Sequence, residues 1–139
     1  MSDLAQFAWP VRVYYEDTDS GGVVYYANYL KFMERARTEL LRQCGIEQER
    51  LKREGKCVFT VHSLDIQYLQ PAHLDDFLNV SATIEKPGKT SLHFSQQVSC
   101  QETGRVFCQG RVRIACLHAE TFRPERLPET LLSEITHVC

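Results

Sequence analysis

Residues 13–41 read VYYEDTDSGGVVYYANYLKFMERARTELL and join an extended start, an acidic glycine-containing turn and a strongly apolar helical pattern. Residues 11–16 are rich in β-branched and aromatic side chains, which predicts a strand ending in the polar turn 17–22. Residues 28–44 repeat apolar side chains at helical spacing, and Gly45 is a natural C-cap. The apolar face is broad, which predicts a helix surrounded by other structure. Its members are Tyr29, Leu30, Phe32, Met33, Ala36, Leu40, Leu41 and Cys44.

After a charged stretch at 47–56, the apolar pattern changes to the alternation typical of strands. Alternating side chains predict strands within 63–68, 78–85, 92–100 and 105–118, joined mostly by turns such as 86–89 and 102–104. Short turns pair consecutive strands antiparallel. No strong pattern follows Phe122. We therefore expect an α+β, hot-dog-like fold, in which a curved antiparallel sheet of about five strands wraps one long central helix. The prediction is one domain over residues 1–139.

Length, charge and apolar content exclude several classes of protein. The 139 residues suffice for one core, and a formal net charge of −2 offers no general attraction to nucleic acid. No apolar run approaches the ~20 residues that span a bilayer. The first ten residues, MSDLAQFAWP, lack the features of a secretory signal. We expect a cytoplasmic protein with no nucleic-acid partner and no integral membrane segment.

The six cysteines show neither C-x-x-C pairs nor zinc-finger spacing. Cys100, Cys108 and Cys116 instead align with apolar neighbours on predicted strands, where a thiol behaves as a small hydrophobe. We expect reduced thiols and no metal site. An acidic calcium loop at 17–28 is also unsupported, because Asn28 stands where a glutamate would close it. No G-x-S-x-G elbow of a serine hydrolase occurs.

The polar turn at 17–22 is the densest candidate for chemistry. Gly21 and Gly22 allow a close approach of backbone to a ligand, and a helix start presents free N–H groups. Such a place can hold a developing oxyanion beside a carboxylate. The residues alone favour a simpler interpretation, in which Asp19 or Ser20 only caps the helix, as acids before helices usually do.

Residues 13–41 closely resemble the YbgC-type acyl-CoA thioesterases of the hot-dog superfamily, which are encoded with the Tol–Pal system of Gram-negative bacteria. The resemblance continues through YLQPAHLDD at 68–76 and KTS at 89–91. It implies hydrolysis of acyl-CoA thioesters to a free acid and CoA, with no metal and no cofactor beyond the CoA of the substrate. It also implies a homodimer or homotetramer with sites at subunit interfaces. Acyl carrier protein is a second potential carrier of the acyl group.

The resemblance places the catalytic carboxylate on Asp19, which either attacks the thioester or activates a water. YbgC-type enzymes usually carry His where this chain has Tyr26. Related 4-hydroxybenzoyl-CoA thioesterases have Tyr there, and its backbone N–H polarises the thioester carbonyl. The remaining implied substrate contacts are Tyr15, Gly22, Val24 and Tyr25, with Tyr14 as a further candidate, and Lys89, Thr90 and Ser91 for the CoA phosphates. Lys86 is close by in the chain, and Arg111 and Arg113, on one face of the last predicted strand, are second-rank candidates for phosphate contacts.

Two other functions remain open on the sequence alone. A hot-dog dehydratase would need a histidine near the helix, and none stands there. A non-catalytic acyl-carrier or lipid-synthesis scaffold that keeps the fold is the alternative from another class, because fold does not fix function.

One charged residue falls inside the apolar face of the predicted helix. Arg37 lies there near Met33, Leu40 and Leu41. A buried guanidinium without a partner is costly, so we expect an acidic partner. Glu34, one turn earlier, is the obvious local candidate for a structural ion pair.

Overall fold

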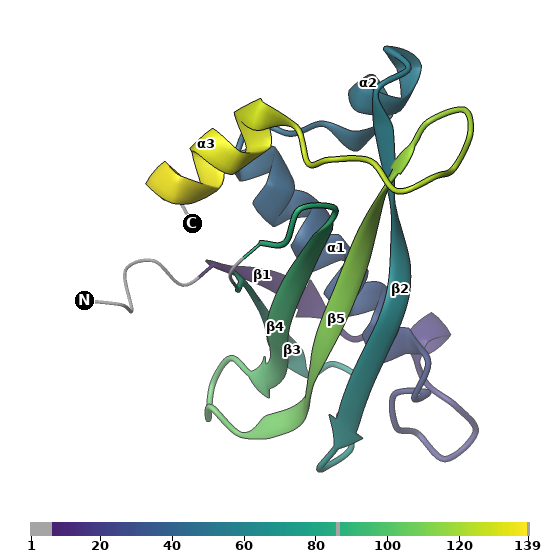
Figure 1. Ribbon diagram of the computed structural model, residues 1–139. Coiled ribbons are helices and arrows are strands. Elements are labelled where there is room, and N and C mark those ends of the chain that lie inside the picture. The colour runs from purple at the N-terminus through teal and green to yellow at the C-terminus, as the bar shows by residue number, and fades with distance from the viewer. Residues whose placement is uncertain (1–6, 86, 139) are drawn as a thin grey trace.

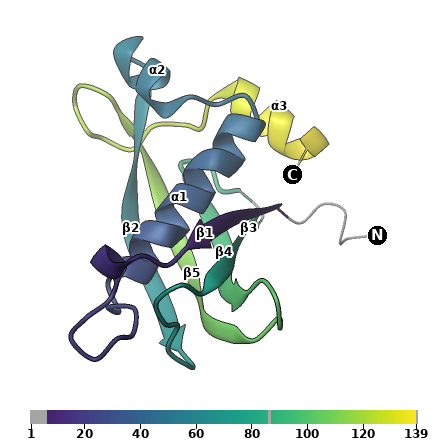
Figure 2. The same cartoon turned by 180° about the vertical axis from the view of Figure 1, so that it is seen from behind.

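Helix α1 (Asn28–Gln43) lies across the concave face of a five-stranded antiparallel sheet (Figure 1, Figure 2). The computed structural model describes residues 7–85 and 87–138. Its strands run in the order β1-β3-β4-β5-β2, and two short helices lie near one end of the sheet (Figure 1). This arrangement confirms the predicted α+β layout. The other elements are β1 (Phe7–Arg12), α2 (Gln48–Arg53), β2 (Cys57–Tyr68), β3 (Phe77–Ile84), β4 (Ser91–Cys100), β5 (Val106–His118) and α3 (Glu129–Val138).

The apolar face of α1 forms the centre of the core. All members of the predicted face except the half-buried Leu30 are at most 3% exposed. Burying each large apolar side chain stabilises the fold by about 1.5–3 kcal/mol. The helix ends as predicted at Gly45, whose φ is 86°. The Gly45 N–H donates to Arg42 O at 2.9 Å and the Ile46 N–H donates to Leu41 O at 2.8 Å, which satisfies the last carbonyls.

The first predicted strand was placed too late in the chain. The strand β1 spans Phe7–Arg12, and residues 15–17 form one turn of 3-10 helix instead. Pro10 is tolerated because β1 is an edge strand that pairs only with β3. The chain turns after β1 because the Asp17 carboxylate accepts a hydrogen bond from the Tyr14 N–H at 2.8 Å.

Two helices lie where no element was predicted. The charged stretch contains α2, which is braced by exposed ion pairs one turn apart, Arg50–Glu54 at 3.2 Å and Arg53–Glu49 at 3.0 Å. The tail contains α3, which starts after Pro128 and is anchored by the fully buried Leu131. Residues 131, 132, 135 and 138 are apolar and recur at helical spacing, a signal of α3 that was not used in predicting the elements.

The structure confirms that Arg37 is buried, but the expected pairing with Glu34 is wrong within the chain. The Arg37 Nη1 donates to Gln96 Oε1 of β4 at 3.0 Å. Gln96 Nε2 donates to the carbonyls of Met33, at 3.0 Å, and Ser81, at 3.2 Å. The Glu34 carboxylate accepts a hydrogen bond from Thr38 Oγ1 at 3.1 Å and acts on the Arg37 charge only through space, without an ion-pair contact. A neutral amide therefore takes the place of the predicted acid.

Candidate active site

Asp19 begins a tight hairpin between the 3-10 turn and α1. Its backbone N–H donates to Val23 O at 2.8 Å, and the Gly22 N–H returns to Asp19 O at 3.0 Å. Gly22 has φ 82°, the left-handed conformation that closes such three-residue hairpin loops and that glycine adopts without strain. Bridges from Val23 to His73 and from Val24 to Thr18 anchor the hairpin.

The Asp19 carboxylate is held by one of its two oxygens. Its Oδ1 accepts the Gly21 N–H at 2.8 Å and, more weakly, the Val23 N–H at 3.4 Å. A Cβ on residue 21 would lie 3.3 Å from this oxygen, so Gly21 leaves the carboxylate room to fold back over the turn. Oδ2 has no hydrogen-bond partner among the residues that the structure describes. Asp19 is exposed in the single chain.

Asp19 caps its own hairpin and not the helix, so the interpretation as a simple helix cap is wrong. The N-cap of α1 is Ala27, nearer the helix, and no side chain bonds to this end. Tyr26 precedes Ala27 and presents a backbone N–H with no acceptor within residues 7–85 and 87–138. The N–H of the preceding Tyr25, by contrast, donates to Asp17 O at 2.9 Å. Tyr26 therefore offers an uncommitted donor at the start of the helix.

A cavity of about 230 Å³ opens beside Tyr26. Tyrosine rings form much of its wall: the ring centroids of Tyr26 and Tyr68 are 6.0 Å apart, and those of Tyr29 and Tyr68 are 5.7 Å apart. The Tyr68 hydroxyl donates to Tyr26 O at 3.3 Å, and the Tyr29 hydroxyl accepts the Ala72 N–H at 3.0 Å. Burial raises the pKa of both Tyr29 and Tyr68, so these hydroxyls stay neutral. The other lining residues are Val24, Leu69, Gln70 and Pro71.

Only some of the predicted substrate contacts gather at this cavity. Val24 lines it, and the Tyr25 ring lies 5.0 Å from the Tyr26 ring. Tyr14 and Tyr15 are 61% and 81% exposed and do not line it. Residues 68–71 form a wall of the cavity that was not predicted from the sequence. Their signal was an apolar, proline-ended segment directly after a strand, which brings it to the edge where α1 begins.

The predicted phosphate contacts lie far from Asp19 within one chain. Ser91 pairs with Ala115, whereas Tyr68 pairs with Cys108, seven positions away on β5 (108 to 115). At ~3.4 Å per residue, about 24 Å separates these two levels of the sheet. Lys89 is exposed, Thr90 is half-buried and Ser91 is buried. Lys86 lies outside the described residues.

Arg111 and Arg113 lie on the outer face of the sheet, away from α1. Arg111 forms an ion pair with Glu85 at 3.7 Å, and Arg113 lies between His93 and Ser63 on the neighbouring strands. Neither arginine borders the cavity beside Tyr26.

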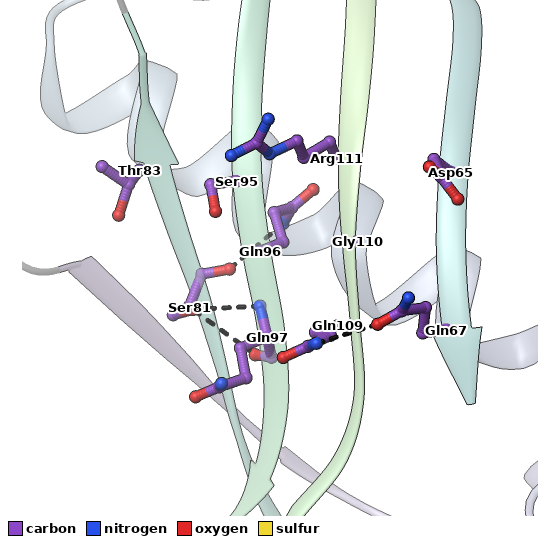
Figure 3. Close-up of a pocket in the computed structure, with 10 residues that line it drawn as sticks. All are labelled: Asp65, Gln67, Ser81, Thr83, Ser95, Gln96, Gln97, Gln109, Gly110 and Arg111. Carbon is purple, nitrogen blue, oxygen red and sulfur yellow. Dashed lines mark hydrogen bonds between the residues drawn. The ribbon is translucent and has the colours of Figure 1, made fainter. Parts of the chain in front are cut away.

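The outer face also carries a polar hollow of about 510 Å³, shown in Figure 3. A row of side chains crosses it from β3 to β2, with Gln109 Nε2 donating to Gln67 Oε1 at 3.0 Å and the Gln97 N–H donating to Ser81 Oγ at 3.1 Å (Figure 3). Mutually satisfied amides and hydroxyls are typical of a solvated sheet face. The hollow lies away from the start of α1, whereas Tyr26 with its uncommitted N–H lines the other cavity, so we assign the candidate site to the cavity beside Tyr26.

The described residues contain no group of three or more histidine, cysteine or acidic side chains placed to hold a metal ion. Within the same residues, no helix combines the length and apolar character needed to cross a membrane.

Comparison with known sequences points to one family. The model of the thioesterase-like superfamily matches residues 13–135. The chain is 41% identical over 128 residues to the acyl-CoA thioester hydrolase YbgC of Escherichia coli O6:H1, covering 92% of this chain and 94% of that protein. It is 38% identical over 132 residues to the acyl-CoA thioesterase YbgC of Haemophilus influenzae, covering 95% of this chain and 96% of that protein.

Solved structures agree. A probable thioesterase from Bartonella henselae superposes with a TM-score of 0.81 at 33% identity, over 88% of this chain and 99% of that one. A 1,4-dihydroxy-2-naphthoyl-CoA thioesterase from Synechocystis superposes with a TM-score of 0.89 over 96% of this chain and 97% of that one. Its identity is 22%, so this likeness concerns the fold alone.

Proposed function

The chain belongs to the thioesterase-like superfamily, and on that premise we propose that it hydrolyses acyl-CoA thioesters to a free acid and CoA. Relatives named as acyl-CoA thioesterases, at 38–41% identity over more than nine-tenths of the chain, support this activity. One observation carries the assignment to a site. The hairpin before α1 holds a carboxylate with only one oxygen hydrogen-bonded, and the start of α1 holds a backbone N–H that has no acceptor in the described residues. Asp19 keeps Oδ2 free in the hairpin that leads into α1, and Tyr26, which lines the apolar cavity, keeps its backbone N–H free.

In the proposed complex, the thioester carbonyl oxygen accepts the Tyr26 N–H. Negative charge grows on this oxygen as the carbonyl carbon becomes tetrahedral, so the hydrogen bond strengthens towards the transition state. Loss of one such donor typically costs roughly 100- to 1,000-fold in rate. The acyl group extends into the cavity lined by Tyr29 and Tyr68, whose apolar ring faces suit a hydrocarbon.

Asp19 has two chemically complete routes. As a nucleophile, Oδ2 forms a bond to the acyl carbon, the C–S bond breaks and the CoA thiolate leaves, and water then hydrolyses the mixed anhydride. As a general base, the carboxylate takes a proton from water while the water oxygen attacks the same carbon; the tetrahedral intermediate then collapses, the C–S bond breaks, and the departing CoA thiolate recovers the proton from Asp19. In both routes the hydrogen bond from Gly21 holds Oδ1 and aims the other oxygen.

The CoA contacts of the proposal need a second subunit. Lys89, Thr90 and Ser91 sit about 24 Å along the sheet from the level of Tyr68, too far for the same chain to complete one compact site. We therefore extend the proposal to a homodimer or homotetramer in which these residues meet the CoA bound at a neighbouring Asp19. A cytoplasmic location, a link to Tol–Pal and acyl carrier protein as a second carrier stay predictions of the resemblance.

A screen of the purified protein against acyl-CoA chain lengths tests the activity, with released CoA thiol as the readout. Blanks without substrate are needed because the chain itself has six cysteines. Substrate-dependent release that Asp19→Asn abolishes supports the proposal. Binding of acyl-CoA with no thiol release at any chain length would favour the non-catalytic scaffold instead.

A further inference from the structure

The first residue of α1, Asn28, has its side chain tied to the turn that precedes Asp19. Its Nδ2 donates to Asp17 O at 2.9 Å, and its backbone N–H donates to Tyr25 O at 2.8 Å. Asn28 is 9% exposed, so its amide is largely shielded from water. The Asp17 carbonyl also accepts the Tyr25 N–H at 2.9 Å, which uses both of its lone pairs. Two hydrogen bonds to one oxygen therefore close the base of the loop 18–27.

The loop 18–27 carries both parts of the candidate site. Asp19 lies two residues after Asp17, and Tyr26 lies two residues before Asn28. The loop projects beyond the start of α1 (Figure 2). One carboxylate and one N–H must act on the same carbonyl group, so the closure of this base helps to set how far apart they stand.

The residue that accepts this bond is itself anchored. The Asp17 carboxylate accepts the Tyr14 N–H at 2.8 Å, and the Asp17 N–H donates to Tyr14 O at 2.9 Å. Val13, directly before Tyr14, is fully buried, and its backbone N–H donates to Asp76 O at 3.0 Å. Asn28 thus ties the start of α1 to a turn that is fixed in the core.

Helix stability alone does not account for an asparagine at this place. Asparagine has a lower helix propensity than alanine, and it stabilises a helix mainly as an N-cap, where its oxygen accepts an N–H of the first turn. The N-cap of α1 is instead Ala27, and no side chain caps this end. Asn28 directs its amide N–H to Asp17 O, outside the helix.

We propose that Asn28 is a positioning residue, whose amide holds the Asp19 carboxylate and the Tyr26 N–H at the spacing that thioester hydrolysis needs. The inference rests on the proposed function and adds a residue to it. Asn28 does not line the cavity beside Tyr26, so we assign it no contact with the acyl group. Its loss should therefore lower kcat and leave substrate binding almost unchanged. A misplacement of about 1 Å in an active site can cost about 100-fold in rate.

Asn28→Ala removes the hydrogen bond and tests the proposal. Alanine favours a helix, and Asp17 O keeps the Tyr25 N–H as a donor, so the melting temperature should stay close to that of the wild type. We expect kcat for acyl-CoA hydrolysis to fall about 10- to 100-fold and KM to change by less than about 2-fold. Gln43→Ala, which truncates an exposed amide side chain at the other end of α1, is the matched control and should keep the wild-type kcat.

Hydrogen exchange measures the tie without turnover. The backbone N–H groups of the loop 18–27 should exchange faster in Asn28→Ala than in Gln43→Ala, because the base of the loop opens more often. The N–H groups of β4 should exchange at the same rate in both variants.

Asn28→Asp is a second variant, whose effect a general loss of stability cannot imitate. The ionised form of the introduced carboxyl group cannot donate to Asp17 O, whereas the protonated form can donate its O–H. Burial favours the protonated form, so the ratio of the variant's kcat to the wild-type kcat should rise about 3-fold or more from about pH 8 to about pH 5. A role in helix stability predicts the opposite trend, because an anion stabilises a helix N-terminus. Repulsion between the introduced carboxylate and Asp19 would also make the ratio fall at acid pH.

Several results would overturn the inference: a folded Asn28→Ala with the kcat of the control, a rise in KM that accounts for the lost activity, or unchanged exchange in the loop. An Asn28→Asp ratio that stays flat or falls on acidification would overturn it too, and failure of both variants to fold would assign Asn28 a purely structural role. A wild type that releases no thiol contradicts the proposed function and this inference together. An active wild type with an unaffected Asn28→Ala contradicts the inference alone.

Discussion

Replacing Asp19 with asparagine separates chemistry from structure at the candidate site. The change is nearly isosteric, and the amide oxygen can still accept the Gly21 N–H that Oδ1 accepts at 2.8 Å. Asp19 is exposed, and its backbone bonds to Val23 and from Gly22 do not involve the side chain. We therefore expect the free energy of unfolding to change by no more than about 0.5 kcal/mol.

Turnover should respond very differently. Asn has no negative charge and no basic oxygen, so neither attack on the thioester nor deprotonation of water remains. General-base catalysis alone is worth about 100- to 10,000-fold, so kcat should fall at least about 100-fold. The Tyr26 N–H and the tyrosine-walled cavity are untouched, so KM for acyl-CoA should stay close to the wild-type value.

Steady-state release of CoA thiol, with a thermal melt on the same sample, measures both quantities. Ser20→Ala is the matched control, because Ser20 is exposed in the same hairpin and its hydroxyl holds no neighbour in place. It should keep wild-type turnover. If folded Asp19→Asn kept a kcat close to that of the control, Asp19 would have no part in the reaction.

Tyr26→Phe should keep most activity, because the proposed donor is the backbone N–H. A collapse of kcat in this variant would show that the hydroxyl takes part in the reaction. A shift in acyl-chain-length preference in Tyr26→His would show that the side chain at position 26 contacts the acyl group. Gln96→Leu should lower the free energy of unfolding by about 3–5 kcal/mol, because it leaves the buried Arg37 and two carbonyls without their hydrogen-bond partner. Gln97→Leu on the outer face should change the free energy of unfolding little. Equal effects in denaturant titrations would contradict the network. Burial raises the pKa of the Cys108 thiol to about 12 from an ordinary value of 9.0, so the unfolded chain loses this proton first and stability should fall as pH rises from about 9 to about 12. Cys108→Ala should remove up to about 1.4 kcal/mol per pH unit of that slope, and parallel stability curves for the two proteins would refute it.

The predictable parts of the fold were those with strong periodicity. The broad apolar face predicted a surrounded helix, and α1 is buried at Phe32, Met33 and Ala36 as expected. Alternation predicted β3 to β5 within a few residues. The start of β1 was missed because only its pairing with β3 makes residues 7–10 extended. Helix α3 was missed although apolar residues at 131, 132, 135 and 138 recur at helical spacing, and the buried Leu131 anchors it.

The family resemblance is confirmed by the superfamily match and by the relatives at 38–41% identity. The roles of individual residues stay predictions. Val24 and Tyr26, which are near neighbours in the chain, line one cavity. Contacts between residues far apart in the sequence were not predicted. Local spacing indicates neither that Tyr68 packs beside Tyr26 nor that Gln96 accepts a hydrogen bond from Arg37. Glu34 was predicted as the partner of Arg37 from helical spacing. Such spacing shows that two residues are neighbours on a helix but does not determine which atoms their side chains bond.

Capping its own hairpin and acting as a catalyst are compatible roles for Asp19, because they use different oxygens. Capping the hairpin engages Oδ1 with the Gly21 N–H and leaves Oδ2 without a partner in the described residues. A carboxylate with no tether would sample many rotamers, and one with both oxygens tethered would have no basic site to offer. Gly21 serves both ends, because its N–H holds the carboxylate and its missing Cβ makes space for it. The hydrogen bond that stabilises the turn is thus also the contact that would orient Asp19 as a nucleophile or base.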